Sequence, residues 1–251
     1  MVTRNDVVVI DLTFLLESSD KSFCGAPLFL GPQGEDNTVV YGVARDLFKL
    51  RQSVGIQHAI LVIGKEADTF SSHANVNSVM QFLRRLRATV VYEPKATTAS
   101  LCSDLSSAAR WVVTQNSVLF QLARDDFGII VPDIAGNGYE LVTVESLKTS
   151  LGIRPAQVPS FLALTEGGKK PVLTKRQAIR LLELHDDLED LLQDTSAVSS
   201  HPIRRQLSAN KKVLLARLCD MKLEKGVCQP AAFTESQLAR RDRPQRACLF
   251  R

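Results

Sequence analysis

The segment that most constrains the fold is a short apolar run near the start of the chain, Asp6–Leu12, with the sequence Asp-Val-Val-Val-Ile-Asp-Leu. It shows no alternation of polar and apolar residues, so a strand formed here has to be buried on both faces. Sheets of that kind are covered by helices above and below. The run therefore predicts a central strand of an α/β sheet.

Strand-like runs alternate with helical patterns over the first 143 residues. Helices are expected at residues 37–53 and 76–86, with Asn37 or Thr38 as the cap of the first and Gly55 just past its end. Further strands are expected at residues 58–63, 89–92 and 110–114. Residues 127–132 and 139–142 are expected to form a hairpin, or a strand followed by an extended segment. This order predicts a mostly parallel central sheet flanked by helices.

The strand patterns stop after residue 143, and helical patterns continue. Helices are expected at residues 144–150, 155–163, 174–184, 187–192 and 210–222. From about residue 229 there is little periodic hydrophobicity, which is typical of a flexible tail. The sequence thus predicts an α/β region at residues 1–143, a helical region at 144–228 and a basic tail at 229–251.

Positive charge is concentrated at the C-terminal end of the chain. Residues 201–251 hold 12 Lys or Arg against 4 Asp or Glu, whereas residues 1–200 hold 19 against 23. A basic segment favours an anionic partner such as nucleic acid. A solvated basic tail is the alternative.

The cysteines and the hydropathy restrict the class of protein. The five cysteines are odd in number and form no Cys-x-x-Cys pair, so we expect buried or idle thiols rather than a zinc site or a disulfide framework. No apolar run has the length of a membrane span, so no membrane partner is expected. We therefore expect an intracellular, reducing compartment; the cytoplasm and a mitochondrial or other organelle matrix stay open.

Several segments occur in an order that matches a known family. Residues 6–12 look like its first strand and residues 37–48 like its first helix, and residues 139–145 followed by 152–164 are the strongest match. Further matches are residues 177–182, 187–192 and 212–218. Over residues 6–228 the chain resembles the 5′-nuclease domain of bacterial DNA polymerase I and its phage and flap-endonuclease relatives. The resemblance implies a PIN-like α/β platform followed by a helix-three-turn-helix region.

The resemblance also implies a cluster of carboxylates that binds two metal ions, and this chain departs from it. Asp11 matches the first metal-binding aspartate. The second aspartate of the family ends the second strand, where this chain has Gly64, and Asp68 lies four residues later. Asn116 and Val118 replace another pair of aspartates. Because a hard cation needs mostly anionic oxygen ligands, these positions indicate a degenerate member without the family's metal site.

Two more acids are the nearest candidates for the remaining positions of the cluster. Asp104 is the one residue that could match an acidic group that opens a helix after the third strand, and Glu166 is the sole acid in Thr165–Pro171. Asp11, Asp68, Asp104 and Glu166 are thus relic candidates for catalysis. If the chain is instead a divergent active enzyme, these four would form a minimal Mg²⁺ site of a 5′–3′ exonuclease. Asp11 has a further interpretation, as a cap for backbone N–H groups at the strand end.

The parts that handle substrate in the family are also reduced. The segment in place of the arch that threads single strands, residues 65–75, is too short to form one, and residues 169–176 lack the family's Gly-x-Gly turn. Phosphates could still be held by charge alone, although a solvated basic loop is the alternative. The candidate nucleic-acid-binding residues are Lys169, Lys170, Lys175, Arg176, Arg204, Arg205, Lys211 and Lys212.

These observations lead to three hypotheses for the function. The first is a catalytically inactive 5′–3′ exonuclease-like protein without a cofactor. It would bind DNA or RNA, or serve as a structural subunit, in a larger nucleoprotein assembly such as a ribonucleoprotein. The second is the divergent active nuclease. The third is a purely protein–protein scaffold, in which the basic surfaces of residues 201–251 meet acidic protein.

Overall fold

The computed structural model describes residues 7–23, 28–70, 73–132, 138–166, 171–223 and 226. The chain divides into two compact units. The first contains Met1–Asn116, Ile129–Glu140 and Glu224–Arg251, and the second contains Ser117–Gly128 and Leu141–Leu223. The main division lies close to the expected one after residue 143, but the structure also assigns residues 117–128 to the second unit. The expected tail, residues 229–251, lies outside the described residues.

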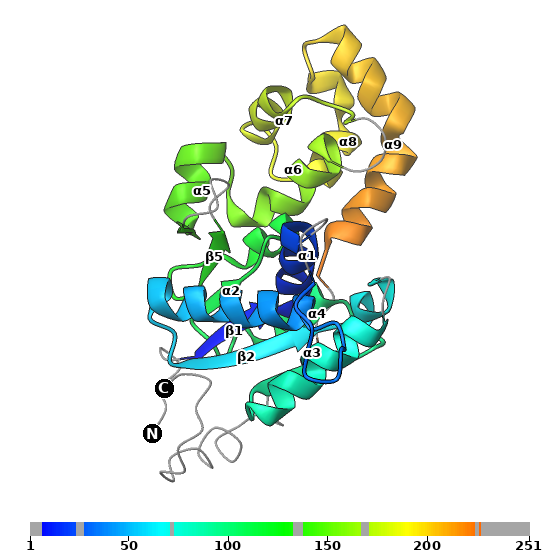
Figure 1. Cartoon of the computed structure of the whole chain (residues 1–251). Helices are drawn as coiled ribbons and strands as arrows, with labels where there is room; N and C mark the ends of the chain where they lie inside the picture. The colour runs from blue at the N-terminus through cyan, green and yellow to red at the C-terminus, as the bar shows by residue number, and fades with distance from the viewer. Residues whose placement is uncertain are drawn as a thin grey trace. The chain divides into compact units, whose positions relative to one another are not determined.

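A six-stranded sheet forms the centre of the α/β region, in the order β3-β2-β1-β4-β5-β6. Figure 1 shows β1 beside β2. β1 is parallel to both β2 and β4, and β2 is parallel to β3. All five residues of β1 are buried, as its unbroken apolar run predicts. The predicted mostly parallel sheet is therefore confirmed. The strands are β1 Val7–Asp11, β2 His58–Ile63, β3 Thr89–Tyr92, β4 Trp111–Val113, β5 Gly128–Pro132 and β6 Tyr139–Val142.

The helices of the first unit cover both faces of its strands. They are α1 Leu12–Phe23, α2 Thr38–Val54, α3 His73–Arg85, α4 Thr98–Leu105 and the 3₁₀ turn η2 Lys65–Thr69. The core of α1, α2 and α3 packs on one face, where Val8 and Ile10 of β1 point. α4 contacts β1 and β2 and carries the buried Leu101 and Cys102.

Two local expectations for this unit need correction. Residues 12–23 form α1, where no helix was expected, because Asp11 ends the strand and Leu12 begins the helix with no turn residue between them. The cap of α2 also differs, since the side chain of Asn37 makes no capping hydrogen bond and Asp36 instead accepts the N–H of Thr38. Gly55 does end α2 in the left-handed conformation, with a φ of 70°.

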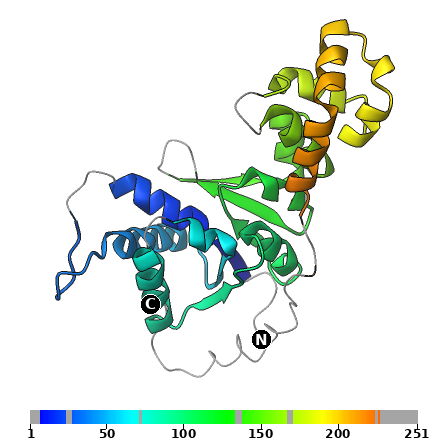
Figure 2. The same ribbon diagram turned by 90° about the vertical axis from the view of Figure 1, so that its right-hand side faces the viewer.

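The second unit is helical around one buried helix, α6. Figure 2 shows the later helices of this unit in yellow and orange. Every residue from Val158 to Leu164 is buried, and α6 contacts α7, α9 and the turn η3. Capping boxes begin α5, through Thr143 and Ser146, and α7, through Thr174 and Gln177. The elements are η3 Ser117–Leu122, α5 Val144–Leu151, η4 Pro155–Gln157, α6 Val158–Thr165, α7 Lys175–Leu182, α8 Leu188–Gln193, η5 Thr195–Ala197 and α9 His201–Met221.

The helical nature of the segment after residue 143 is confirmed within the described ranges. The start of α9 was predicted too late, at residue 210, because its first nine residues contain a single buried residue, Leu207, and so show little apolar periodicity. Pro202 at the first turn marks the true beginning, since proline is favoured there. None of the described helices combines the length and the hydropathy that a membrane span requires.

Candidate functional site

The strand order places a switch point between β1 and β4. The chain proceeds outward from β1 to β3 and then returns to the other side of β1 with β4. In open α/β sheets, ligands bind outside the carboxyl ends of the strands at this point. A cavity of about 380 Å³ lies there, and its polar lining includes Asp11, Glu17, Glu66, Thr98, Gln115 and Asn116. The fold alone therefore singles out this cavity, the switch-point pocket, as the candidate site.

Asp11, the last residue of β1, is only 3% exposed and is held by donors on both carboxylate oxygens. Oδ1 accepts the N–H of Thr13 at 3.0 Å and also the Thr13 hydroxyl. Oδ2 accepts the Thr114 hydroxyl at 2.8 Å. Burial raises the pKa of Asp11 above its usual value of 3.8, and the hydrogen bonds from Thr13 and Thr114 oppose that rise. Hydrogen bonds thus connect the Asp11 carboxylate to residues that follow β1 and β4. Asp11 also accepts the backbone N–H of Thr13, as the capping interpretation expects.

Thr114 connects the two strand ends across the switch point. It follows β4 directly, is fully buried, and accepts the N–H of Asn116 at 2.9 Å while it donates to Asp11. A neutral hydroxyl therefore contacts the Asp11 carboxylate, and the residues that reach the pocket from beyond β4 are the amides Gln115 and Asn116.

Glu66 is a pocket residue that the sequence interpretation missed. Its Oε2 accepts both the N–H and the hydroxyl of Thr98, at 2.9 and 2.8 Å. Since Thr98 is the first residue of α4, the Glu66 carboxylate lies at the positive end of the helix dipole, which favours an acid. The sequence signal for Glu66 is weak, because it is one of two acids shortly after Gly64 and nothing in the pattern separates it from Asp68.

The other predicted acids lie elsewhere. Asp68 lines a different cavity. Asp104 is six residues beyond Thr98 on α4, about 9 Å along the helix axis, and accepts the N–H of Gly226 at 2.9 Å. Glu166 is exposed and belongs to the second unit, where its carbonyl accepts from Arg217. Of the four relic candidates, only Asp11 lines the switch-point pocket.

Gly64 shows why a second carboxylate is missing at the end of β2. A Cβ atom at this position would lie 2.3 Å from the carbonyl oxygen of Ala96 and 2.6 Å from the N of Thr98. The backbone there is fixed, because the N–H of Gly64 donates to the Thr98 hydroxyl and the N–H of Lys65 donates to the Ala96 carbonyl. The start of α4 thus occupies the space that an aspartate side chain would need.

A 5′-nuclease fold implies two metal ions, which would need several carboxylate ligands in the switch-point pocket. Three carboxylates line the pocket, but Asp11 and Glu66 are engaged by hydroxyl and N–H donors, and Glu17 pairs with Lys21 at 3.2 Å. Throughout the described ranges, no three His, Cys, Asp or Glu residues lie close enough together to hold a metal ion. Because two divalent cations need a dense set of anionic oxygens, the residues present do not fit them.

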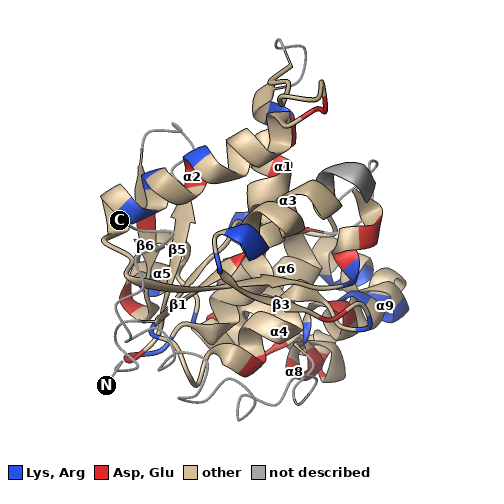
Figure 3. Cartoon of the chain, turned by 60° about the horizontal axis from the view of Figure 1, so that its bottom comes forward, with Lys and Arg blue, Asp and Glu red and all other residues tan. Residues whose placement is uncertain are grey.

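The predicted phosphate-binding residues divide into two groups. Lys175 and Arg176 at the start of α7 and Arg205 and Lys212 on α9 are exposed. Figure 3 shows Lys and Arg positions of α9 in blue. Arg204, which is half-buried, and Lys211, which is exposed, also donate hydrogen bonds within the second unit. Arg204 donates to the Val198 carbonyl at 2.7 Å, and Lys211 donates to the Leu192 carbonyl at 2.9 Å. Lys169 and Lys170 lie outside the described residues.

Comparison with known proteins connects this architecture to nucleases. No family model and no curated protein matches the sequence. Among solved structures, a 5′-exonuclease of phage T5 has a TM-score of 0.62 at 9% identity and covers 87% of this chain and 88% of its own. The catalytic core of Rad2 in complex with a DNA substrate has a TM-score of 0.57 at 14% identity, with 94% and 89% covered. Human GEN1 in complex with Holliday junction DNA has a TM-score of 0.57 at 13% identity, with 93% and 68% covered. The expected 5′-nuclease fold is therefore confirmed.

Proposed function

We propose that this chain, which has the fold of the 5′-nucleases, binds nucleic acid without cleaving it. The observation that carries the proposed loss of cleavage is the set of hydrogen bonds that the Asp11 carboxylate accepts. Both of its carboxylate oxygens are occupied by Thr13 and Thr114, and Gly64 next to it has no room for a second acid.

Loss of cleavage follows from the requirements of phosphodiester hydrolysis. Two metal ions activate the attacking water and stabilise the leaving oxygen, and several carboxylates hold these ions. In this pocket an ion would have to share the carboxylates of Asp11 and Glu66 with the hydrogen bonds from Thr114 and Thr98. Those hydrogen bonds already draw on the negative charge that the ion needs. A divergent active site is disfavoured as well, because Asp68 and Asp104 do not line the pocket that contains Asp11.

Nucleic-acid binding is supported by charge and by the structural neighbours. Rad2 and GEN1, which share the fold, were solved in complex with DNA. The exposed Lys175, Arg176, Arg205 and Lys212 lie on α7 and α9, where they are free to reach phosphates. Each phosphate that they neutralise releases counterions, so the affinity should fall steeply with salt.

A place in a larger assembly is supported by an apolar surface of the first unit. Leu28, Phe29 and Leu30 are 62%, 42% and 62% exposed, and Tyr41 and Phe48 on α2 are 47% and 57% exposed. The rings of Phe29 and Tyr41 stack at 4.2 Å, which joins the segment before α2 to the exposed face of that helix. Exposed apolar patches of this kind are typical of protein interfaces. We therefore propose that the chain is a subunit of a nucleoprotein complex, such as a ribonucleoprotein.

The test combines cleavage and binding on the full chain. A labelled flap substrate with Mg²⁺ or Mn²⁺ should remain intact, while duplex DNA and structured RNA are bound with a salt-dependent affinity. The double variant Lys175→Ala/Arg176→Ala should reduce the slope of log K against log salt by about 2 on duplex DNA. The matched variant Lys49→Ala/Lys95→Ala removes two exposed charges from the first unit and should change the slope little. Cleavage that Asp11→Ala abolishes would refute the absence of catalysis, and the absence of binding to both duplex DNA and structured RNA would favour the pure protein scaffold.

A further inference from the structure

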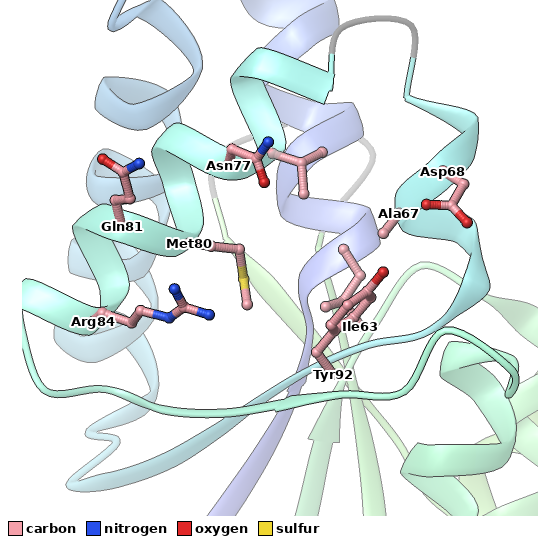
Figure 4. Close-up of a pocket in the computed structure, with 9 residues that line it drawn as sticks. Ile63, Ala67, Asp68, Asn77, Met80, Gln81, Arg84 and Tyr92 are labelled. Carbon is pink, nitrogen blue, oxygen red and sulfur yellow. The ribbon is translucent and has the colours of Figure 1, made fainter.

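A second cavity, which the proposed function does not use, lies at the carboxyl ends of β2 and β3 (Figure 4). Its volume is about 260 Å³, and it shares no lining residue with the switch-point pocket. Ile63 and Tyr92, the last residues of the two strands, form its base, while η2 and α3 form its walls. We refer to it as the β2–β3 pocket.

The floor of the β2–β3 pocket is apolar and its edges are polar. Ile63 and Ala67 are buried and Met80 is half-buried, whereas Tyr92 has 47% of its surface exposed. Figure 4 shows Met80 extending from α3 toward Ile63 and Tyr92. A flat apolar group can therefore contact a thioether and an aromatic ring at once, both of which pack well against π systems.

Opposite charges stand at the two sides of this floor. Asp68 projects from η2 and Arg84 from α3, and the apolar side chains lie between them (Figure 4). Both residues are exposed, and neither makes an ion pair or a side-chain hydrogen bond with any other part of the chain that the structure describes. A ligand can therefore approach both groups without first breaking a protein contact.

We infer that the β2–β3 pocket binds a nucleoside monophosphate. The base would lie on Ile63 and Met80 beside the ring of Tyr92, its N–H groups would donate to Asp68, and its phosphate would accept from Arg84. The guanidinium group suits this role because it donates two parallel hydrogen bonds to a phosphate. The volume is near the lower limit of roughly 300–1,000 Å³ for ligand pockets, which suits one nucleotide.

Other small ligands match this arrangement less well. An amino acid with a neutral side chain carries its only ammonium and carboxylate groups on one carbon, so it cannot place them at opposite sides of the apolar floor. Inorganic phosphate would leave the floor empty. A nucleotide has its hydrogen-bonding base edge and its phosphate at opposite ends of a flat body, as the pocket requires.

The chemistry of Asp68 also predicts which base binds best. An ionised carboxylate only accepts hydrogen bonds and has two oxygens for the purpose. Guanine presents an imino and an amino N–H side by side on one edge, whereas adenine presents one amino group and uracil one imino group there. GMP should therefore bind more tightly than AMP or UMP, and replacement of Asp68 by Asn should remove this preference.

The experiment is a calorimetric titration of the full chain with GMP, AMP, UMP and guanosine. We expect saturable GMP binding that Arg84→Ala weakens about tenfold or more, with guanosine binding unchanged. Arg85→Ala is the matched control, because Arg85 is the exposed neighbour on α3 that does not line the pocket. Competition by a 5′-phosphorylated oligonucleotide, but not by its 5′-hydroxyl form, would identify the end of a strand as the source of the nucleotide; without competition the source is a free nucleotide.

Two results would overturn the inference. One is the absence of GMP binding up to about 1 mM, a concentration that corresponds to a very weak site. The other is an equal loss on Arg84→Ala and Arg85→Ala, which would show that only general charge is involved. Neither result depends on α7, α9 or the cleavage assay, so the pocket can be tested separately from the proposed function.

Discussion

Removal of the Thr114 hydroxyl tests the bond that joins the two strand ends at the switch point. Thr114 is fully buried, donates to Asp11 at 2.8 Å and accepts the N–H of Asn116 at 2.9 Å. Valine has nearly the same shape, so Thr114→Val deletes both hydrogen bonds without leaving a large cavity. A hydrogen bond to a charged group contributes about 1.5–3 kcal/mol and a neutral one about 0.5–1.5 kcal/mol. We expect the variant to lose about 2–4 kcal/mol of stability.

The assay is thermal unfolding followed by circular dichroism at pH 7.5. For a chain of this size, 1 kcal/mol corresponds to roughly 2–4 °C, so the midpoint should fall by roughly 5–15 °C. Thr149→Val is a suitable control, because the exposed Thr149 hydroxyl donates only to the Glu145 carbonyl of its own helix. In an Asp11→Asn background the loss should be smaller, since the charged acceptor is gone. A midpoint within about 2 °C of the wild type would refute the role assigned to this pair.

Three further changes probe the same account. The Asp11→Asn variant should gain stability relative to the wild type as the pH rises. Burial raises the pKa of Asp11 in the folded state, so its contribution to stability is complete below the usual pKa of 3.8 and is lost as the pH rises through the folded-state pKa. Melting curves of both proteins between pH 4 and 8 should therefore converge or cross, and parallel curves would contradict the prediction. Gly64→Asp should lower the melting point without creating nuclease activity, because the new Cβ meets backbone atoms at 2.3 and 2.6 Å; a stable variant would disprove the crowding. Arg204→Ala should cost about 1–2 kcal/mol in chemical unfolding and leave the salt slope of DNA binding unchanged, since its guanidinium bonds the Val198 carbonyl; a flatter slope would instead make Arg204 a phosphate contact.

The sequence predicts most of the sheet because the strands carry their own signal. The runs at His58–Ile63 and Thr89–Tyr92 are apolar and β-branched, and the structure places strands at those residues. The helix α1 was missed for a local reason: apolar residues continue from the strand into the helix at Leu12, so the pattern shows no boundary. The strand patterns depend only on residues that are neighbours in the sequence, and for this reason the sequence alone reveals them.

The candidate site depends on contacts that sequence patterns do not contain. Glu66 acquires its role from Thr98, which is 32 residues away, and Asp11 contacts Thr114 over a separation of 103 residues. The crowding at Gly64 is likewise imposed by the backbone of residues 96–98. Resemblance to the nuclease family pointed to Asp11, but only the structure shows which groups surround it.

Cleavage by the purified full chain is the most direct test of the central claim. The measurement is product formation from a labelled 5′-flap substrate with Mg²⁺ or with Mn²⁺, in parallel with Asp11→Asn and with an active flap endonuclease. The wild type and the variant should both yield no product above background while the substrate is bound. Product that forms with the wild type and disappears with Asp11→Asn would show that the switch-point pocket is catalytic.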